Sequence, residues 1–380
     1  MSRLHRPPVR GARFRAGRRR FLQGTAALAA GLALPARGAA EPVPGNRPEG
    51  GATRAYSLQT GRTTAELHGA GSRRFPAWGY NGGVPGPVLR VRQGERIRVA
   101  VDNGLDQATT IHWHGVRVPH AMDGVPWVTQ RPIEPGGRFV YEFTPTDAGT
   151  FWYHPHMHSE EQVGRGLYGA LIVEESEPPE VDRDLTWLLD DWRFTSDGAE
   201  LAAGFGNRHD RMHGGRVGNH VTINGRPPRD LMLRRGERVR LRLINAANAR
   251  IFALRFAGHR TWIIARDGQP GVPVRLDDDE PLLLAPGMRI DLILDGDGDP
   301  GVRHPLRDTF YEGLEYDLAA IGYAAGRPLR TVAERDPPIL PANPLAEPDI
   351  PAGGRHRITL DGGMMGDMGG LIVDGAAAAT

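Results

Sequence analysis

The sequence of 380 residues contains no cysteine and no lysine. Without cysteine the chain can form no disulfide bond and can hold no metal through a thiolate. Without lysine, all 47 basic residues are arginine, which looks like the imprint of a GC-rich genome rather than of function. Glycine and proline, with 51 and 32 residues, make up more than a fifth of the chain. This content predicts an all-β fold with many turns between short strands.

The first forty residues read as an export signal. They hold nine arginines and no acidic residue, and Arg18-Arg19-Arg20 stands before the apolar run from Ala26 to Leu34. This order resembles a twin-arginine signal, with a cleavage site after Gly38-Ala39-Ala40. The apolar run is too short to span a bilayer, so no membrane anchor is expected after cleavage. We therefore predict a periplasmic or extracellular protein that is exported folded.

Removal of this signal changes the charge of the protein. The whole chain carries a formal charge of +2, and loss of nine arginines leaves about −7. A negative chain gives no reason to expect nucleic-acid binding.

Two histidine pairs carry the strongest chemical signal. His112 and His114 form one pair, and His154 and His156 form the second, with His158 two residues further on. Alternate residues of a strand point to the same face, so each pair presents two imidazoles to one point in space. Neutral imidazole is a preferred ligand of copper, zinc, iron and nickel. The spacing predicts a metal site.

The sequence also contains an internal repeat. Residues 81–103 and 224–245 match at an offset of about 142, and each holds a strand, a Gly-Glu-Arg turn and a second strand of alternating apolar and charged residues. The same offset places Leu254 opposite His112 and Phe256 opposite His114, so the second copy lacks the ligands. We predict the following domains: a signal peptide at 1–40, domain one at 41–178, domain two at 179–330, a Pro-rich linker at 331–354, and the start of an incomplete third domain at 355–380.

Four segments resemble the first domain of multicopper oxidases, in the laccase-like group: His112–Gly115, Asp123–Pro126, Gly149–His156 and Gly166–Val173. The resemblance implies an all-β fold of tandem cupredoxin domains, which are Greek-key β sandwiches, with two complete here and a third only begun. It also implies copper as the cofactor.

The resemblance further implies individual roles. His112 would bind the type 2 copper of a trinuclear cluster, while His114, His154 and His156 would bind the type 3 pair. Asp123 matches an acidic residue that hydrogen-bonds near the cluster and helps to supply protons; a plain turn residue before Gly124 is the alternative.

The chain departs from the family in its last part. The cysteine, histidines and methionine of a type 1 copper site are absent, and four of eight cluster ligands are present. We expect the front portion of an oxidase that couples oxidation of a small reductant or Cu(I) to reduction of O2 to water, inactive alone. A periplasmic copper-binding protein without enzymatic activity and a copper-free cupredoxin scaffold are the alternatives. Copper binding by His158 and by Met364, Met365 and Met368 stays open.

Overall fold

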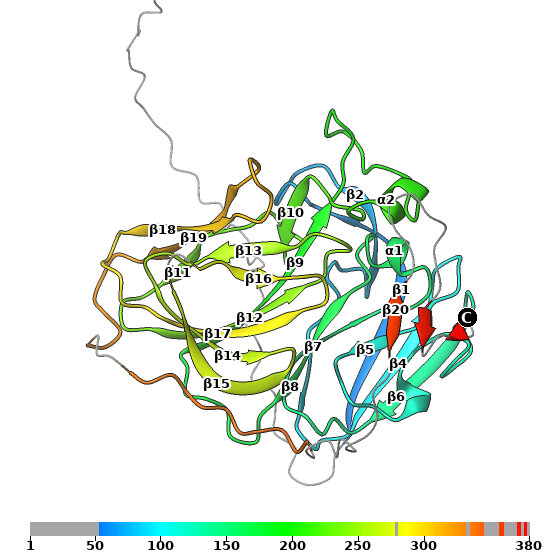
Figure 1. Cartoon of the computed structure of the whole chain (residues 1–380), viewed down its shortest axis with the longest axis horizontal. Helices are drawn as coiled ribbons and strands as arrows, with labels where there is room; N and C mark the ends of the chain where they lie inside the picture. The colour runs from blue at the N-terminus through cyan, green and yellow to red at the C-terminus, as the bar shows by residue number, and fades with distance from the viewer. Residues whose placement is uncertain are drawn as a thin grey trace, which may run out of the picture. The chain divides into compact units, whose positions relative to one another are not determined.

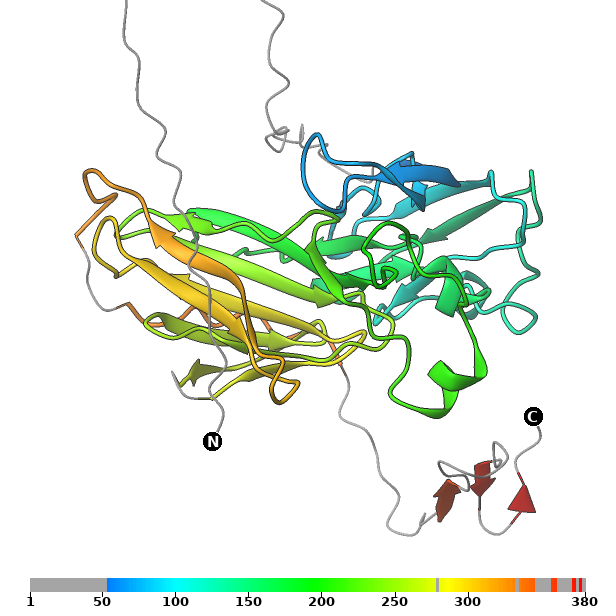
Figure 2. The same cartoon turned by 90° about the horizontal axis from the view of Figure 1, so that it is seen from above.

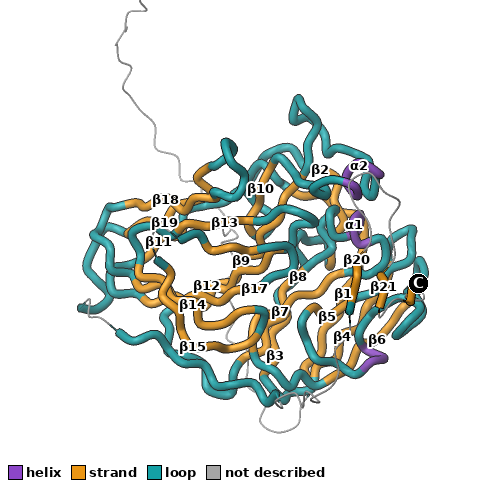
Figure 3. Tube along the Cα trace, viewed as in Figure 1, coloured by secondary structure: helices purple, strands orange, loops and turns teal. Residues whose placement is uncertain are grey.

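The computed structural model describes residues 53–277, 280–331, 335–345, 357–360, 371–373 and 376–377. The chain divides into two compact units, Met1–Arg47 and Pro48–Thr380, and every described residue belongs to the second. The predicted signal peptide and Met364, Met365 and Met368 lie outside the described residues. Strands dominate, and Figure 3 shows helix at only a few short segments. None of the helices described has the length and apolar character needed to cross a bilayer.

The first sandwich consists of two four-stranded sheets (Figure 1). One sheet has the order β2-β1-β4-β6, with β2 at Phe75–Tyr80, β1 at Arg54–Ala65, β4 at Ile97–Asn103 and β6 at Arg138–Phe143. The other has the order β3-β8-β7-β5, with β3 at Leu89–Arg92, β8 at Gly169–Glu174, β7 at Gly149–His154 and β5 at His112–His114. Two short helical turns flank them, η1 at His120–Met122 and α1 at Ser159–Gln162.

The second sandwich is larger and is coloured green to orange in Figure 2. Its six-stranded sheet has the order β10-β9-β12-β17-β14-β15: His220–Ile223, Arg183–Trp192, Arg238–Asn245, Arg289–Asp295, Arg260–Arg266 and Gln269–Leu276. Its five-stranded sheet has the order β11-β19-β18-β13-β16: Leu231–Leu233, Tyr316–Tyr323, Arg303–Asp308, Phe252–Arg255 and Leu282–Leu284. Helix α2 spans Arg208–Met212. A separate three-stranded sheet joins β20 (Ile358–Leu360), β21 (Leu371–Val373) and β22 (Ala376–Ala377).

The strand orders of the two sandwiches correspond, as the sequence repeat predicts. The series β2-β1-β4-β6 matches β10-β9-β12-β17, and β3-β8-β7-β5 matches β11-β19-β18-β13. Both copies pair their first and fourth strands in parallel, β1 with β4 and β9 with β12. In this correspondence β13 stands where β5 stands in the first copy. Leu254 of β13 and Phe256 just after it are buried, so apolar residues occupy the positions that are equivalent to the first histidine pair.

The core of each sandwich lies between its two sheets. In the first, Trp113 of β5 and Tyr153 of β7 are fully buried with Val99 and Tyr141 from the facing sheet. Because side chains alternate along a strand, these two aromatic residues lie on the face opposite the histidines. The histidines therefore project from the outer face of the sheet.

The outer face of the β7–β8 pair is covered by the second sandwich, which explains why every residue of β7 is buried. Trp152 and Ile172 of the first sandwich pack against Leu188 of β9 and Ile244 of β12. Along β7 the outward row of side chains is Thr150, Trp152 and His154, because side chains alternate. This row links the interface between the sandwiches to the histidines.

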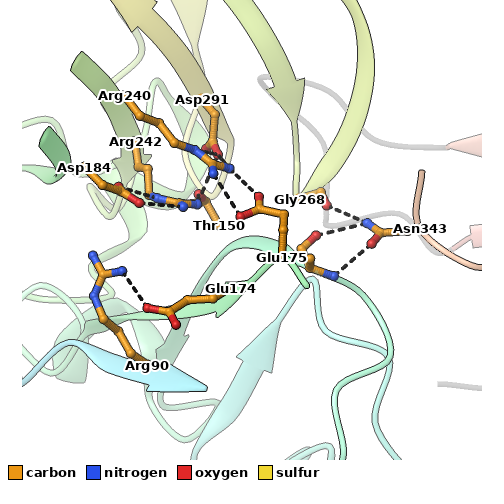
Figure 4. A network of polar contacts seen from close by, with 11 residues as sticks. Arg90, Thr150, Glu174, Glu175, Asp184, Arg240, Arg242, Gly268, Asp291 and Asn343 are labelled. Carbon is orange, nitrogen blue, oxygen red and sulfur yellow. Dashed lines mark hydrogen bonds and ion pairs between the residues drawn. The ribbon is translucent and has the colours of Figure 1, made fainter. Parts of the chain in front are cut away.

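Buried charges fill the rest of this interface (Figure 4). Arg240 is 1% exposed and donates hydrogen bonds to both carboxylate oxygens of Glu175, at 3.0 and 2.7 Å, and to Asp291 at 2.6 Å. Arg242, also 1% exposed, donates to Thr150 Oγ1 at 2.8 Å. The alternating arginines of β12 therefore do not face solvent. They bind acidic and hydroxyl groups of both sandwiches.

The segment 335–345 contacts both sandwiches as well. The Asn343 side chain accepts a hydrogen bond from the Ala148 amide at 2.8 Å and donates to the Gly268 carbonyl at 3.1 Å (Figure 4). Leu340 is buried against the outer face of the six-stranded sheet. This part of the predicted Pro-rich linker is packed on the protein.

Candidate metal centre

Two adjacent strands bring the predicted ligands together. Strand β5 pairs antiparallel with β7, and His112 lies directly opposite His154 while His114 lies opposite Trp152. His156 follows the end of β7, and its amide donates to Thr110 Oγ1 at 3.2 Å. The two pairs are 40 residues apart in sequence, and the hydrogen-bond register makes them neighbours. We call His112, His114, His154 and His156 the histidine quartet.

The four imidazoles form a compact cluster. The His112 ring centroid lies 4.4 Å from that of His156, 5.5 Å from that of His154 and 5.8 Å from that of His114. His154 lies 5.5 Å from His114 and 5.4 Å from His156. Potential ligand atoms of His112, His114 and His154 all lie within 4.8 Å of one another. All four predicted ligands are therefore side by side.

His158 stands apart from this arrangement. It is exposed, and it takes a left-handed backbone conformation, with φ 43° and ψ 48°, directly before α1. The strand alternation that aligns the quartet has ended at this point.

Hydrogen bonds fix the orientation of two quartet rings. His112 Nδ1 lies 2.8 Å from the Asp123 carbonyl oxygen, and His154 Nδ1 lies 3.0 Å from the Pro155 carbonyl oxygen. A carbonyl only accepts, so each Nδ1 carries the proton and donates it. The lone pair of each ring is then on Nε2, which leaves that nitrogen able to bind a metal.

One pair of nitrogens fits a single metal ion. His114 Nδ1 lies 3.2 Å from His154 Nε2. Two nitrogens that are each bound at about 2.0–2.1 Å to one ion are this far apart when the nitrogen–metal–nitrogen angle is about 100°. Without metal, His114 Nδ1 donates its proton to His154 Nε2. With metal, both atoms present lone pairs to the ion, so the donor set is chemically suited to copper.

Burial keeps these imidazoles neutral. Desolvation, and next the positive charge of Arg289, lower the pKa of His114 to about 3. Desolvation also lowers the pKa of His154 well below its usual value, and lowers that of His156. A metal binds the neutral form of imidazole. Because the pKa values of these three rings are lowered, the rings are neutral near neutral pH and are ready to bind an ion.

Asp123 contacts the quartet through two groups. Besides its carbonyl, its carboxylate Oδ1 lies 3.2 Å from His112 Nδ1, and its side chain is 34% exposed. Gly124, the next residue, has φ +78°, and a Cβ there would overlap the carbonyl of Ile111. The glycine therefore lets the turn press against the strand before His112 and holds Asp123 beside the ring.

The quartet lines a cavity of about 710 Å³ that the second sandwich helps to build. Ala246, Asn248 and Pro286–Gly287 form part of its wall, and residues of the segment 206–216 form another part. Gly287 has φ +80°, and a Cβ there would lie 3.0 Å from His114 Cε1. The sequence does not predict this contact, because periodicity does not reveal which turns meet across a domain boundary.

The histidines of the second copy lie outside the quartet. His209 of α2 and the following His213 are exposed, His220 makes an edge-to-face contact with His68, and His259 stacks on Tyr323.

Family models and curated relatives agree on one family. A family model described as multicopper oxidase matches residues 62–178, and a second with this description matches residues 183–302. Copper resistance protein A of Pseudomonas syringae pv. tomato is 31% identical over 358 residues, covering 81% of this chain and 55% of the relative. Multicopper oxidase MmcO of Mycobacterium tuberculosis is 32% identical over 249 residues, covering 58% of this chain and 48% of the relative. The chain spans about half the length of the curated relatives it matches.

Solved structures give the same answer. The multi-copper oxidase of Pseudomonas thermotolerans has a TM-score of 0.70 and 40% identity, covering 79% of this chain and 70% of that one. Lac15 from a marine microbial metagenome has a TM-score of 0.65 and 41% identity, covering 78% of this chain and 73% of that one.

Proposed function

The chain belongs to the multicopper oxidase family, and from this premise we propose that the histidine quartet binds copper as the first-domain half of a trinuclear copper centre. His112 is the ligand for the type 2 copper, and His114, His154 and His156 are the ligands for the type 3 pair. The observation that carries the proposal is the 3.2 Å approach of His114 Nδ1 to His154 Nε2 inside a cluster of four imidazoles.

Each residue of the site has a definite task in this proposal. The carbonyls of Asp123 and Pro155 orient His112 and His154 so that Nε2 faces the metal. The Asp123 side chain, beside His112 and part exposed, helps to supply protons from solvent to the centre. Bound copper would supply the redox chemistry for the transfer of electrons from the reductant to dioxygen. The second sandwich closes one side of the cavity and brings Gly287 against His114.

We propose the whole reaction as a copper-dependent oxidation of a small reductant or Cu(I), coupled to the reduction of O2 to water. The 380 residues include no cysteine, so they offer no thiolate for a type 1 copper, which in this family receives the electrons. This chain alone is therefore expected to bind copper and not to turn over. We also propose that it works in the periplasm or outside the cell, after twin-arginine export.

Copper titration of the purified chain tests the site. The change His154→Ala should remove copper from the quartet, because it deletes a ligand whose Nε2 is 3.2 Å from His114 Nδ1. The matched control is His158→Ala, which removes an exposed imidazole four residues along and should leave the copper content unchanged. Equal copper binding by both variants and the wild type would contradict the proposal.

Oxygen uptake tests the expected inactivity. The copper-loaded chain, given a phenol or Cu(I) as reductant, should consume no dioxygen catalytically. Sustained uptake with multiple turnovers would show that these 380 residues form a complete oxidase. If copper binds without uptake, the chain by itself behaves as a copper-binding protein, which was the first alternative.

A further inference from the structure

Helix α2 and its C-cap residue carry three metal-binding side chains. His209 and Met212 are three residues apart in the helix and are neighbours on its surface, and the ring of the C-cap residue His213 contacts that of His209. His209 and His213 are exposed, and Met212 is partly exposed. Two imidazoles and a thioether therefore face the same region outside the protein. None of them belongs to the histidine quartet.

The helix is held firmly by its other contacts. The Asn207 side chain caps the helix by accepting a hydrogen bond from the Asp210 amide at 2.9 Å. The buried Asp210 carboxylate accepts two hydrogen bonds from Arg193 Nη1, at 2.9 and 3.0 Å. Asp210 is thus engaged with the protein, and these contacts hold the short helix in place.

The two imidazoles lie close together. Their rings are stacked with centroids 4.3 Å apart and an interplanar angle of 23°. His213 Nδ1 lies 2.9 Å from the His209 carbonyl oxygen, so Nδ1 donates and Nε2 keeps the lone pair. Small side-chain rotations bring a nitrogen of each ring onto one ion, since both rings are exposed. Met212 Sδ accepts a weak hydrogen bond from Arg208 Nε at 3.2 Å, a contact that a metal would compete with.

We propose that His209, Met212 and His213 form a second copper site, separate from the quartet. Imidazole binds Cu(II) well and thioether sulfur selects Cu(I), so this mixed set suits copper in both oxidation states better than it suits zinc. The segment that carries this site also forms part of the wall of the quartet's cavity, through Gly206, Asp210, Gly215 and Arg216. Helix α2 of this segment is labelled in Figure 1. This second site therefore holds a copper ion on a segment that lines the same cavity as the quartet.

Copper stoichiometry of the full chain tests the second site. The change His209→Ala with His213→Ala should lower the number of tightly bound copper ions by one and leave the quartet loaded. The matched control, His120→Ala with His158→Ala, removes two exposed imidazoles from separate parts of the first sandwich and should lose no copper. The proposal fails if the wild type and the first variant bind equal amounts, or if the control loses as much. Circular dichroism of each variant checks that exposed positions were changed without unfolding.

Two single variants examine the chemistry. Met212→Leu should weaken Cu(I) binding at this site at least tenfold and change Cu(II) binding little, because only the soft ligand is removed. Arg208→Ala should strengthen binding, because it removes a nearby positive charge and the competing donor to sulfur. The assignment would be overturned if Met212→Leu weakened Cu(II) binding more than Cu(I) binding, or if Arg208→Ala weakened binding. This site uses no quartet residue, so its loss and the loss of quartet copper in His154→Ala are separately measurable.

Discussion

Replacement of Arg240 by methionine should destabilise the chain by about 3–5 kcal/mol, the usual cost of removing one partner from a buried ion pair. Arg240 is 1% exposed and donates to both oxygens of Glu175 and to Asp291, at 2.6–3.2 Å. Asp291 keeps Arg242 at 3.2 Å after the change, while Glu175 loses the bonds to both of its oxygens. The loss of stability therefore arises mainly from one buried, unpaired carboxylate between the sandwiches (Figure 4).

A neighbouring pair provides the control. Arg90 pairs with Glu174, the residue next to Glu175, at 3.3 Å, but the two side chains are 37% and 40% exposed. Arg90→Met should cost less than about 1 kcal/mol, because water screens an exposed pair. Both variants would be unfolded in urea and followed by tryptophan fluorescence, and the first transition would be compared with that of the wild type.

The double change Arg240→Met with Glu175→Met sharpens the test. It removes both charges together, so it should recover much of the stability that the single change loses. The reasoning about buried charge is refuted if Arg240→Met costs no more than Arg90→Met, or if the double variant is as unstable as the single one.

Three further outcomes are expected. Asp123→Asn should weaken copper binding by the quartet about 10–100-fold in a competition titration, since it weakens the contact to His112 Nδ1 and keeps the carbonyl contact; unchanged affinity would make Asp123 a plain turn residue. Gly124→Ala should cost about 1–3 kcal/mol in thermal unfolding, because φ is +78° there and a Cβ would overlap a backbone carbonyl; a wild-type melting temperature would contradict this. The hydrogen bond from Arg330 is the main cause that lowers the pKa of Asp182 from 3.8 to about 2, so its stabilising effect is present above pH 3.8 and is lost as the pH falls through 2. The stability difference between the wild type and Asp182→Asn should therefore shrink on acidification, and a constant difference from pH 7 to 2 would contradict the assignment.

The sequence predicted the repeat, the strand character and the quartet because all three depend on local periodicity. A spacing of two places His112 and His114 on one face, and the opposite face holds Trp113 in the core. The offset of 142 residues places Leu254 opposite His112, and in the structure Leu254 is buried on β13, the strand that corresponds to β5.

The interface between the sandwiches could not be predicted from the same pattern. Alternation in β12 shows that Arg240 and Arg242 share a face, but it does not show whether water or another domain covers that face. Here the partners Glu175 and Thr150 come from the first sandwich, 65 and 92 residues away. The contact of Gly287 with His114 was missed for a similar reason, because it joins turns of two different domains.

The coupling of this interface to the site follows from strand β7. Its outward side chains are Thr150, held by Arg242, then Trp152, packed on the second sandwich, then His154 of the quartet. The buried ion network therefore fixes the strand that carries a proposed copper ligand. Variants that separate the sandwiches are expected to loosen the quartet as well.

Anomalous diffraction at the copper edge, from crystals of the chain soaked in copper, tests the central claim most directly. The account predicts a strong copper peak between His114 Nδ1 and His154 Nε2, within about 2.0–2.1 Å of both nitrogens, and its loss in crystals of the His154→Ala variant. Copper peaks elsewhere on the protein, with none among the four quartet imidazoles, would contradict it.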